Sequence, residues 1–227
     1  MAYFLDPNAQ PQPFFRAPPA VFAAVAALVL AHLARDLLPP DLSNEIIYLY
    51  GLIPSRYTID PYGSLIERLV PFVTYMFVHG DWTHVVFNAV WLFVFGAVVV
   101  RRWGTARFVL FCLLCGLGAA LTYLAFNPDS SAPMIGASGA IAGLMAAGFR
   151  MIGADEENLT PLLDRRILIW SAVWSVLNVV MGVIGFGADG SIREIAWQAH
   201  LGGYFSGLLL AGLFDRARPR HLMADGA

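Results

Sequence analysis

The stretch "MIGASGAIAGLMAAGFR", residues 134–150, combines apolar side chains with four glycines, five alanines and a single serine. In a helix surrounded by water, each glycine costs about 1 kcal/mol relative to alanine. Between membrane helices, small residues instead allow two backbones to approach closely, where lipid offers no hydrophobic drive for association. This composition therefore favours a tightly packed helix inside a bilayer.

The composition of the whole chain also indicates a membrane protein. Of its 227 residues 58% are hydrophobic and 13% are charged, and the mean hydropathy is +0.64, whereas about 25% of residues are charged in soluble domains. The net charge is −2, and all fourteen basic residues are arginine. Because no segment forms a basic stripe interleaved with aromatic residues, we expect no nucleic-acid partner.

Six apolar stretches have about the length that a membrane-spanning helix needs. They cover roughly residues 19–38, 82–100, 106–126, 136–152, 167–187 and 196–214. The sequence thus predicts an all-α, polytopic membrane domain of six helices over residues 19–214, embedded in a lipid bilayer. The proline-rich segment 1–18 has no apolar core followed by a cleavage site, so we do not interpret it as a removable signal.

The distribution of arginine predicts the orientation of these helices, because cytoplasmic loops carry an excess of basic residues. If the N-terminus lies inside, ten arginines are on the inner side and four on the outer side. The sequence therefore predicts that the segment 1–18 and the tail 215–227 are both cytoplasmic. The inner set is Arg16, Arg101, Arg102, Arg107, Arg150, Arg165, Arg166, Arg216, Arg218 and Arg220, and the outer set is Arg35, Arg56, Arg68 and Arg193.

The longest connection, residues 39–81, is apolar but interrupted by prolines and charged residues. Neither of its two apolar runs is long enough to span a bilayer. We expect short amphipathic pieces that lie in or on the outer leaflet.

Four of the polar side chains inside the predicted spans stand out, because a polar group at membrane depth is costly and often functional. They are His84, Asn88, Ser138 and His200. Taken singly, each is explained as a packing residue or an interhelical hydrogen-bond partner. On the predicted topology, however, their three helices all begin on the outer side, and all four residues lie within about two turns of a helix start. We therefore expect one polar cluster at a shallow outer depth.

Small residues recur at every fourth position beside the serine and the second histidine of this cluster. One stripe is Gly139, Gly143 and Ala147, and the other is Ala199, Gly203, Gly207 and Ala211. Such stripes predict that two helices pack closely against each other. This packing should bring the Ser138 hydroxyl and the His200 imidazole within hydrogen-bond reach.

These side chains suit acyl-transfer chemistry. A serine hydroxyl becomes a good nucleophile when a neighbouring base takes its proton, and neutral histidine is the usual base. Candidate donors to an oxyanion are His84, the Asn88 amide and the Ser138 backbone N–H. Because no carboxylate lies at matching depth, the sequence predicts a dyad of Ser138 and His200, without a metal or cofactor. Cys112 and Cys115 lie in an apolar run and are interpreted as packing residues.

These motifs resemble those of the rhomboid intramembrane serine proteases. The resemblance rests on "GASGA" with Ser138, on "AHLGG" with His200, and on "HGDWTHVVFN" with His79, His84 and Asn88. It covers the whole six-helix core. It implies that Ser138 is the nucleophile and His200 the general base, and that His84, Asn88 and the Ser138 amide bind the oxyanion.

The resemblance also implies roles around the site. The fifth helix and the following loop would admit a substrate's transmembrane segment sideways, which points to Trp170, Trp174 and "GFGADGS". His79 would be a structural residue at the start of the second helix. Gly136 should let the backbone enter the fourth helix and keep the oxyanion space open, and Gly139 begins the packing stripe.

Two positions depart from the family pattern. Many relatives have a Trp-Arg pair in the first outer loop, and the nearest element here is Arg56 with Tyr57. Four residues after the nucleophile, many relatives place a tyrosine on the catalytic histidine, whereas this chain has Ala142. We expect Tyr204 or another ring to hold the imidazole instead.

The sequence alone leaves three candidate functions. The favoured one is an intramembrane serine endopeptidase of the bacterial inner membrane, cutting transmembrane segments of membrane proteins near the outer (periplasmic or extracellular) face. The second is a catalytically inactive rhomboid-like protein that binds transmembrane clients, although its expected signature is the loss of serine or histidine, and both are present. The third, a small transporter or channel, would need ionisable groups deeper along a route through the membrane, and the inner halves of the predicted spans are nearly free of them. Substrate and oligomeric state stay open.

Overall fold

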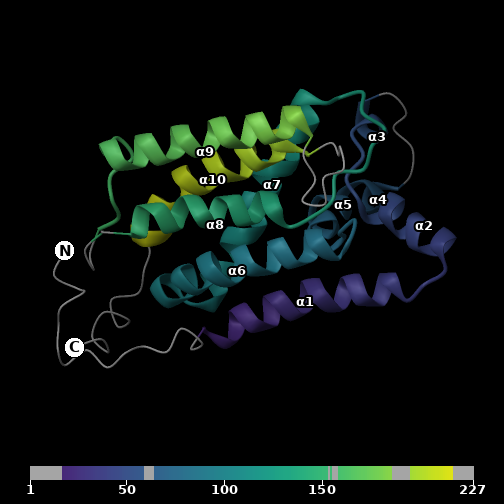
Figure 1. The fold of residues 1–227 in the computed structure, drawn as a ribbon, viewed down its shortest axis with the longest axis horizontal. Coiled ribbons are helices and arrows are strands. Elements are labelled where there is room, and N and C mark those ends of the chain that lie inside the picture. The colour runs from purple at the N-terminus through teal and green to yellow at the C-terminus, as the bar shows by residue number, and fades with distance from the viewer. Residues whose placement is uncertain (1–16, 59–63, 153, 155–157, 186–194, 217–227) are drawn as a thin grey trace.

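The computed structural model describes residues 17–58, 64–152, 154, 158–185 and 195–216, and these form the all-α fold that the sequence predicts. Six long helices dominate it. They are α1 (Pro19–Asp36), α6 (Trp82–Trp103), α7 (Thr105–Phe126), α8 (Ser138–Met151), α9 (Arg165–Ile184) and α10 (Trp197–Arg216). Helices α6, α8 and α10 begin at the same end of the bundle, and α1, α7 and α9 run in the opposite direction (Figure 1).

Short helices occupy the connection between α1 and α6. They are α2 (Pro40–Tyr50), α3 (Ser55–Thr58), α4 (Leu65–Leu69), α5 (Pro71–Thr74) and the 3-10 turn η2 (Tyr75–Phe77). These elements gather at the end of the bundle where α6, α8 and α10 begin (Figure 1). The short helical pieces expected between the first two long helices are therefore present.

Among the described residues, four helices are long and apolar enough to cross a membrane, namely α1, α6, α7 and α9. The protein is therefore a multi-pass integral membrane protein. Helix α10 has 20 residues, but Gln198 and His200 in its first turn make it less apolar. Helix α8 has 14 residues, and at 1.5 Å per residue it covers about 21 Å, against a hydrocarbon core of about 30 Å.

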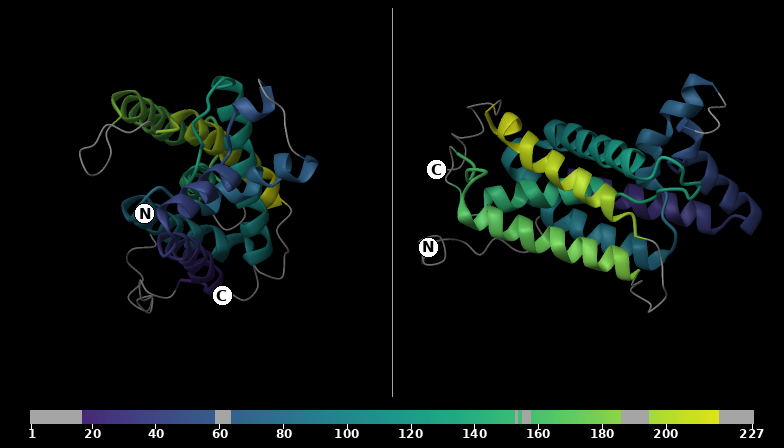
Figure 2. Two further views of the ribbon diagram at one scale, coloured as in Figure 1. Left: turned by 90° about the vertical axis from the view of Figure 1, so that its right-hand side faces the viewer. Right: turned by 90° about the horizontal axis from the view of Figure 1, so that it is seen from above.

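The short helix α8 is the central element of the bundle. It contacts α6, α7, α9 and α10, and eleven of its fourteen residues are buried. In contrast, α9 lies at the periphery (Figure 2) and buries only Ile167 and Ser171. Because α8 is enclosed by longer helices, its first residue, the half-buried Ser138, lies within the bundle.

The two predicted small-residue stripes face each other across α8 and α10. A Cβ at position 203 would overlap the carbonyl oxygen of Gly139, and one at position 207 would overlap that of Gly143. Gly143 is also packed against the side chain of Cys115 from α7. Glycine is therefore required here, because any side chain would force the helix backbones apart.

The other end of α10 is held by a charged cluster. Asp215 accepts hydrogen bonds from Arg102 Nε at 2.6 Å and from Trp103 Nε1 at 2.9 Å, both at the end of α6. In addition, Arg150 of α8 donates to the Leu208 carbonyl at 2.9 Å. The Arg150 bond and the glycine contacts together set the register of α10 against α8, and the Asp215 bonds hold the end of α10 against α6.

Candidate active site

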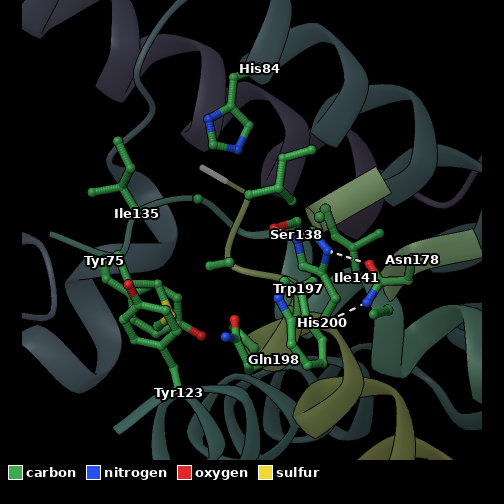
Figure 3. Close-up of a pocket in the computed structure, with 18 of the residues that line it drawn as sticks. Tyr75, His84, Tyr123, Ile135, Ser138, Ile141, Asn178, Trp197, Gln198 and His200 are labelled. Carbon is green, nitrogen blue, oxygen red and sulfur yellow. Dashed lines mark hydrogen bonds between the residues drawn. The ribbon is translucent and has the colours of Figure 1, made fainter. Parts of the chain in front are cut away.

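Helices α8 and α10 bring Ser138 and His200 into direct contact. His200 Nε2 lies 2.7 Å from Ser138 Oγ, a normal hydrogen-bond distance. Ser138 is the first residue of α8, and His200 lies in the first turn of α10. The contact that the small-residue register predicts is therefore present, and the two side chains point toward each other (Figure 3).

The second ring nitrogen of His200 contacts α9. His200 Nδ1 lies 2.8 Å from Asn178 Oδ1, and Asn178 Nδ2 donates to the carbonyl oxygen of Trp197 at 3.0 Å. Sequence reasoning missed Asn178. The signal was available, because an amide in the apolar run of α9 is a costly polar group of the kind that marks a functional site.

The expectation that the Tyr204 ring holds the imidazole is wrong. Tyr204 stacks on Trp174 of α9, with ring centroids 4.3 Å apart and an interplanar angle of 16°. Its hydroxyl pairs with Ser171 Oγ at 2.8 Å. Tyr204 is four residues after His200, so it lies one turn further along α10 and reaches the next turn of α9.

His84 lies on the opposite side of Ser138 from Asn178 (Figure 3). Its position is set at the start of α6, where Asp81 caps the helix by accepting the His84 backbone N–H at 2.9 Å. The His84 ring packs against Gly136, because a Cβ at that position would lie 2.5 Å from Nε2. Gly136 also has a φ of +106°, which residues with a side chain rarely adopt.

The helix start at Ser138 is itself suited to negative charge. No side chain caps α8, and the first N–H groups of a helix have no partner within the helix. The helix dipole adds partial positive charge at this end. An anion that forms beside Ser138 would therefore be stabilised by the backbone.

These residues line one cavity of about 1120 Å³, which reaches from α6 across the start of α8 to α9 and α10. Ser138, His200, His84, Asn88 and Asn178 all contribute to its wall. Pockets for small molecules measure about 300–1,000 Å³. The cavity is therefore at least as large as a typical small-molecule pocket.

A family model described as the Rhomboid domain matches residues 67–216, which is more than half of the chain. The chain belongs to the rhomboid family. The resemblance that the three sequence motifs indicated is confirmed.

The protein is similar to rhomboid proteins of a plant and of bacteria. It is 28% identical over 172 residues to Rhomboid-like protein 11, chloroplastic, of Arabidopsis thaliana, covering 75% of this chain and 56% of that protein. It is 27% identical over 194 residues to Rhomboid protease GluP of Bacillus subtilis (86% and 34%). It is 26% identical over 154 residues to Rhomboid protease AarA of Providencia stuartii (60% and 52%). The chain thus spans between about a third and just over half of the length of these curated relatives.

Two further residues of the rhomboid motif lie near His84, namely His79, which precedes α6, and Asn88, which is one turn along it. Asn88 is buried, and its Nδ2 donates to the His84 carbonyl at 2.9 Å, which leaves its second amide hydrogen available. His79 is fully buried, with its ring edge-on to that of His84 at 5.0 Å. Burial lowers the pKa of His79 to about 3, so it is neutral at physiological pH.

The two tryptophans of the expected rhomboid gate line different cavities. Trp174 lines the large cavity. Trp170 is one turn away along α9, where its ring is tilted against that of Phe149 at 5.8 Å, and it lines a separate cavity of about 200 Å³. Of the expected gate loop, residues 186–191 lie outside the described residues.

The contact between Gly136 and His84 leads to a stability prediction. We expect Gly136→Ala to lower the free energy of unfolding by about 1–3 kcal/mol, because the methyl group meets the imidazole and the backbone is strained. Thermal unfolding in detergent micelles measures this effect. The matched control is Gly80→Ala, whose Cβ would lie 3.8 Å from Ile135 Cδ1, an ordinary contact. Equal melting temperatures for the two variants would contradict the prediction.

Proposed function

We propose that this rhomboid protein is an intramembrane serine endopeptidase, which hydrolyses peptide bonds in or near transmembrane segments of membrane proteins. The 2.7 Å contact between Ser138 Oγ and His200 Nε2 carries this proposal. Two relatives named proteases add support. Ser138 is the nucleophile and His200 is the general base.

In the first half of the reaction, Ser138 Oγ attacks the carbonyl carbon of the scissile bond and its proton passes to His200 Nε2. The tetrahedral intermediate carries an oxyanion, which the first N–H groups of α8 stabilise. His84 and the second amide hydrogen of Asn88 are the additional donors that we propose, because both residues line the same cavity as Ser138. His200 then transfers its proton to the leaving amine, and an acyl-serine ester remains.

In the second half, His200 takes a proton from a water molecule, whose oxygen attacks the ester. The tetrahedral intermediate collapses, and the proton returns to Ser138 Oγ. The products are two peptides with a new carboxyl terminus and a new amino terminus.

The large cavity supports a substrate that is locally unwound. The carbonyl of a helical residue is bonded within its own helix and shielded from attack. A cavity that holds a polypeptide segment and polar groups can satisfy the freed backbone. We propose that such a segment passes along α9, and that Trp170 and Trp174 belong to its gate, because α9 is the peripheral helix.

The proposed topology has six helices in the membrane, with both termini in the cytoplasm and the site toward the outer face of a bacterial inner membrane. The alternating directions of the long helices support the even number of crossings (Figure 1). The excess of arginine at the predicted inner side supports the orientation. Helix α8, with 14 residues, is too short to span the bilayer by itself, and the longer helices that it contacts enclose it.

Labelling with a serine-reactive fluorophosphonate tests the proposed function. We expect the detergent-solubilised wild type to be labelled and Ser138→Ala to remain unlabelled, because only a serine activated by a base reacts readily. Ser171→Ala, which removes a serine that bonds to Tyr204, should be labelled like the wild type. A wild type without label would favour the inactive client-binding protein, and labelling of Ser138→Ala would place the reactive serine elsewhere.

A further inference from the structure

One face of α9 meets α10 with a four-residue repeat of Trp174, Asn178 and Gly182. Trp174 stacks on Tyr204, and a Cβ at Gly182 would lie 2.5 Å from the Trp197 side chain. Asn178 lies between these two packing contacts. It therefore brings a polar amide into the part of the helix interface that is nearest to the serine.

The hydrogen bonds of Asn178 determine the direction of its amide. The Trp197 carbonyl can only accept, so the amide nitrogen of Asn178 must face it, and Nδ2 donates there at 3.0 Å. The amide oxygen then faces His200 Nδ1 at 2.8 Å (Figure 3). The position of one backbone carbonyl thus decides which atom of Asn178 meets the imidazole.

The direction of the amide in turn determines the tautomer of His200. An amide oxygen only accepts hydrogen bonds, so Nδ1 must carry the ring proton. In a neutral imidazole, Nε2 is then the acceptor. Nε2 is the nitrogen that lies 2.7 Å from Ser138 Oγ, so the serine hydroxyl donates to it. This is the state from which a base takes the serine proton.

We propose that Asn178 is a positioning residue for His200, which fixes the tautomer with a free Nε2 and holds the imidazolium that forms during the reaction. The proposal rests on the proposed function of Ser138 and His200. A neutral amide performs this task without the desolvation cost of a buried carboxylate. The site thus has a third member, contributed by α9.

The alternative is that Asn178 has a purely structural role. The chain contains a second hydrogen bond between α9 and α10 that allows the two roles to be compared. Ser171 also lies on α9 and also bonds to α10, through the Tyr204 hydroxyl at 2.8 Å, but it does not touch His200. On either side of Asn178, α9 has largely exposed residues, such as Val176 at 61% and Val183 at 72%. Both hydrogen bonds therefore help to hold a weakly buried helix against α10, but only Asn178 contacts His200.

The rate of inactivation by a fluorophosphonate tests the proposal, measured over probe concentration in detergent micelles. We expect Asn178→Leu, which keeps a similar shape without hydrogen bonds, to lower the maximal inactivation rate by about 10- to 100-fold, because a bond to a group that becomes charged is lost. The probe concentration at half-maximal rate should not change. Asn178→Asp, which still accepts from Nδ1 but no longer donates to the Trp197 carbonyl, should recover part of the rate, and Ser171→Ala should react like the wild type.

Three results would overturn the proposal: a wild-type rate in Asn178→Leu, an equal loss in Ser171→Ala, or no recovery in Asn178→Asp. Nitrogen-15 NMR of the histidine-labelled wild type gives a second test that does not depend on a variant at 178. We expect the proton of His200 on Nδ1, with the signal assigned by its loss in His200→Ala. A proton on Nε2 would overturn the proposal. Failure of the wild type to react would instead contradict the proposed function, and the tautomer could still be read.

Discussion

Replacing His200 with alanine is expected to lower the rate of substrate cleavage by roughly 10⁴- to 10⁶-fold, as the loss of the catalytic base does in serine proteases. The serine then has no acceptor at Nε2 for its proton, and the leaving amine has no donor. The measurement is cleavage of a model membrane protein in proteoliposomes, with a small residue and a helix-breaking residue near the outer end of its transmembrane segment.

The matched control for His200→Ala is Tyr204→Phe, on the same helix and one turn further along. This variant keeps the ring stacked on Trp174 and removes only the hydroxyl that meets Ser171. We expect it to cleave the substrate at nearly the wild-type rate. A His200→Ala variant that retained most of the activity would remove His200 from the proposed mechanism.

Substitution of Gly203 by alanine is expected to have the largest effect on stability. The new methyl group would overlap the Gly139 carbonyl oxygen, which is backbone and cannot rotate away. Helix α10 would have to separate from α8, at a cost of about 3 kcal/mol, the upper part of the usual range for overpacking. The melting temperature in detergent micelles should fall by about 6–12 °C. Labelling of the serine should also be lost, because its contact with His200 depends on this packing.

Gly212→Ala tests whether this effect belongs to the helix contact. Position 212 is on the same helix, but there a Cβ would lie 3.5 Å from the nearest side-chain atom, Arg150 Nη1. Alanine also favours a helix over glycine by about 1 kcal/mol. We expect Gly212→Ala to melt at or above the wild-type temperature. If Gly203→Ala behaved in the same way, the close packing of α8 and α10 would not be a source of stability.

The relation between Ser138 and His200 could be predicted because it depends on local sequence patterns. Small residues at every fourth position define one face of each helix, and each polar residue is adjacent to its stripe. Two helices that contact along these faces have little choice of register, since side chains elsewhere would collide. The pairing of His84 and Asn88 on one face follows from their spacing of four residues in the same way.

The environment of the imidazole could not be predicted in this way, as Asn178 and Tyr204 illustrate. Both side chains lie on helices whose apolar residues are spread around the whole circumference. The sequence pattern therefore does not show whether either side chain faces lipid or protein. Which one meets His200 depends on the rotation and the height of α9 relative to α10. Those quantities are set by the Trp174 stack, by Gly182 and by two hydrogen bonds, which join residues far apart in the sequence.

By itself, the sequence determined an all-helical membrane protein with rhomboid motifs, and it determined that a serine and a histidine share one helix contact. These properties follow from apolar composition and from the helical repeat, which act over a few neighbouring residues. Only the tertiary structure decided that α8 is a short and enclosed helix, that Gly136 makes room for the His84 ring, and that Asn178 meets His200 Nδ1. The physical reason is that a hydrogen bond or a steric overlap between distant segments is defined to within tenths of an ångström by the packing of whole helices.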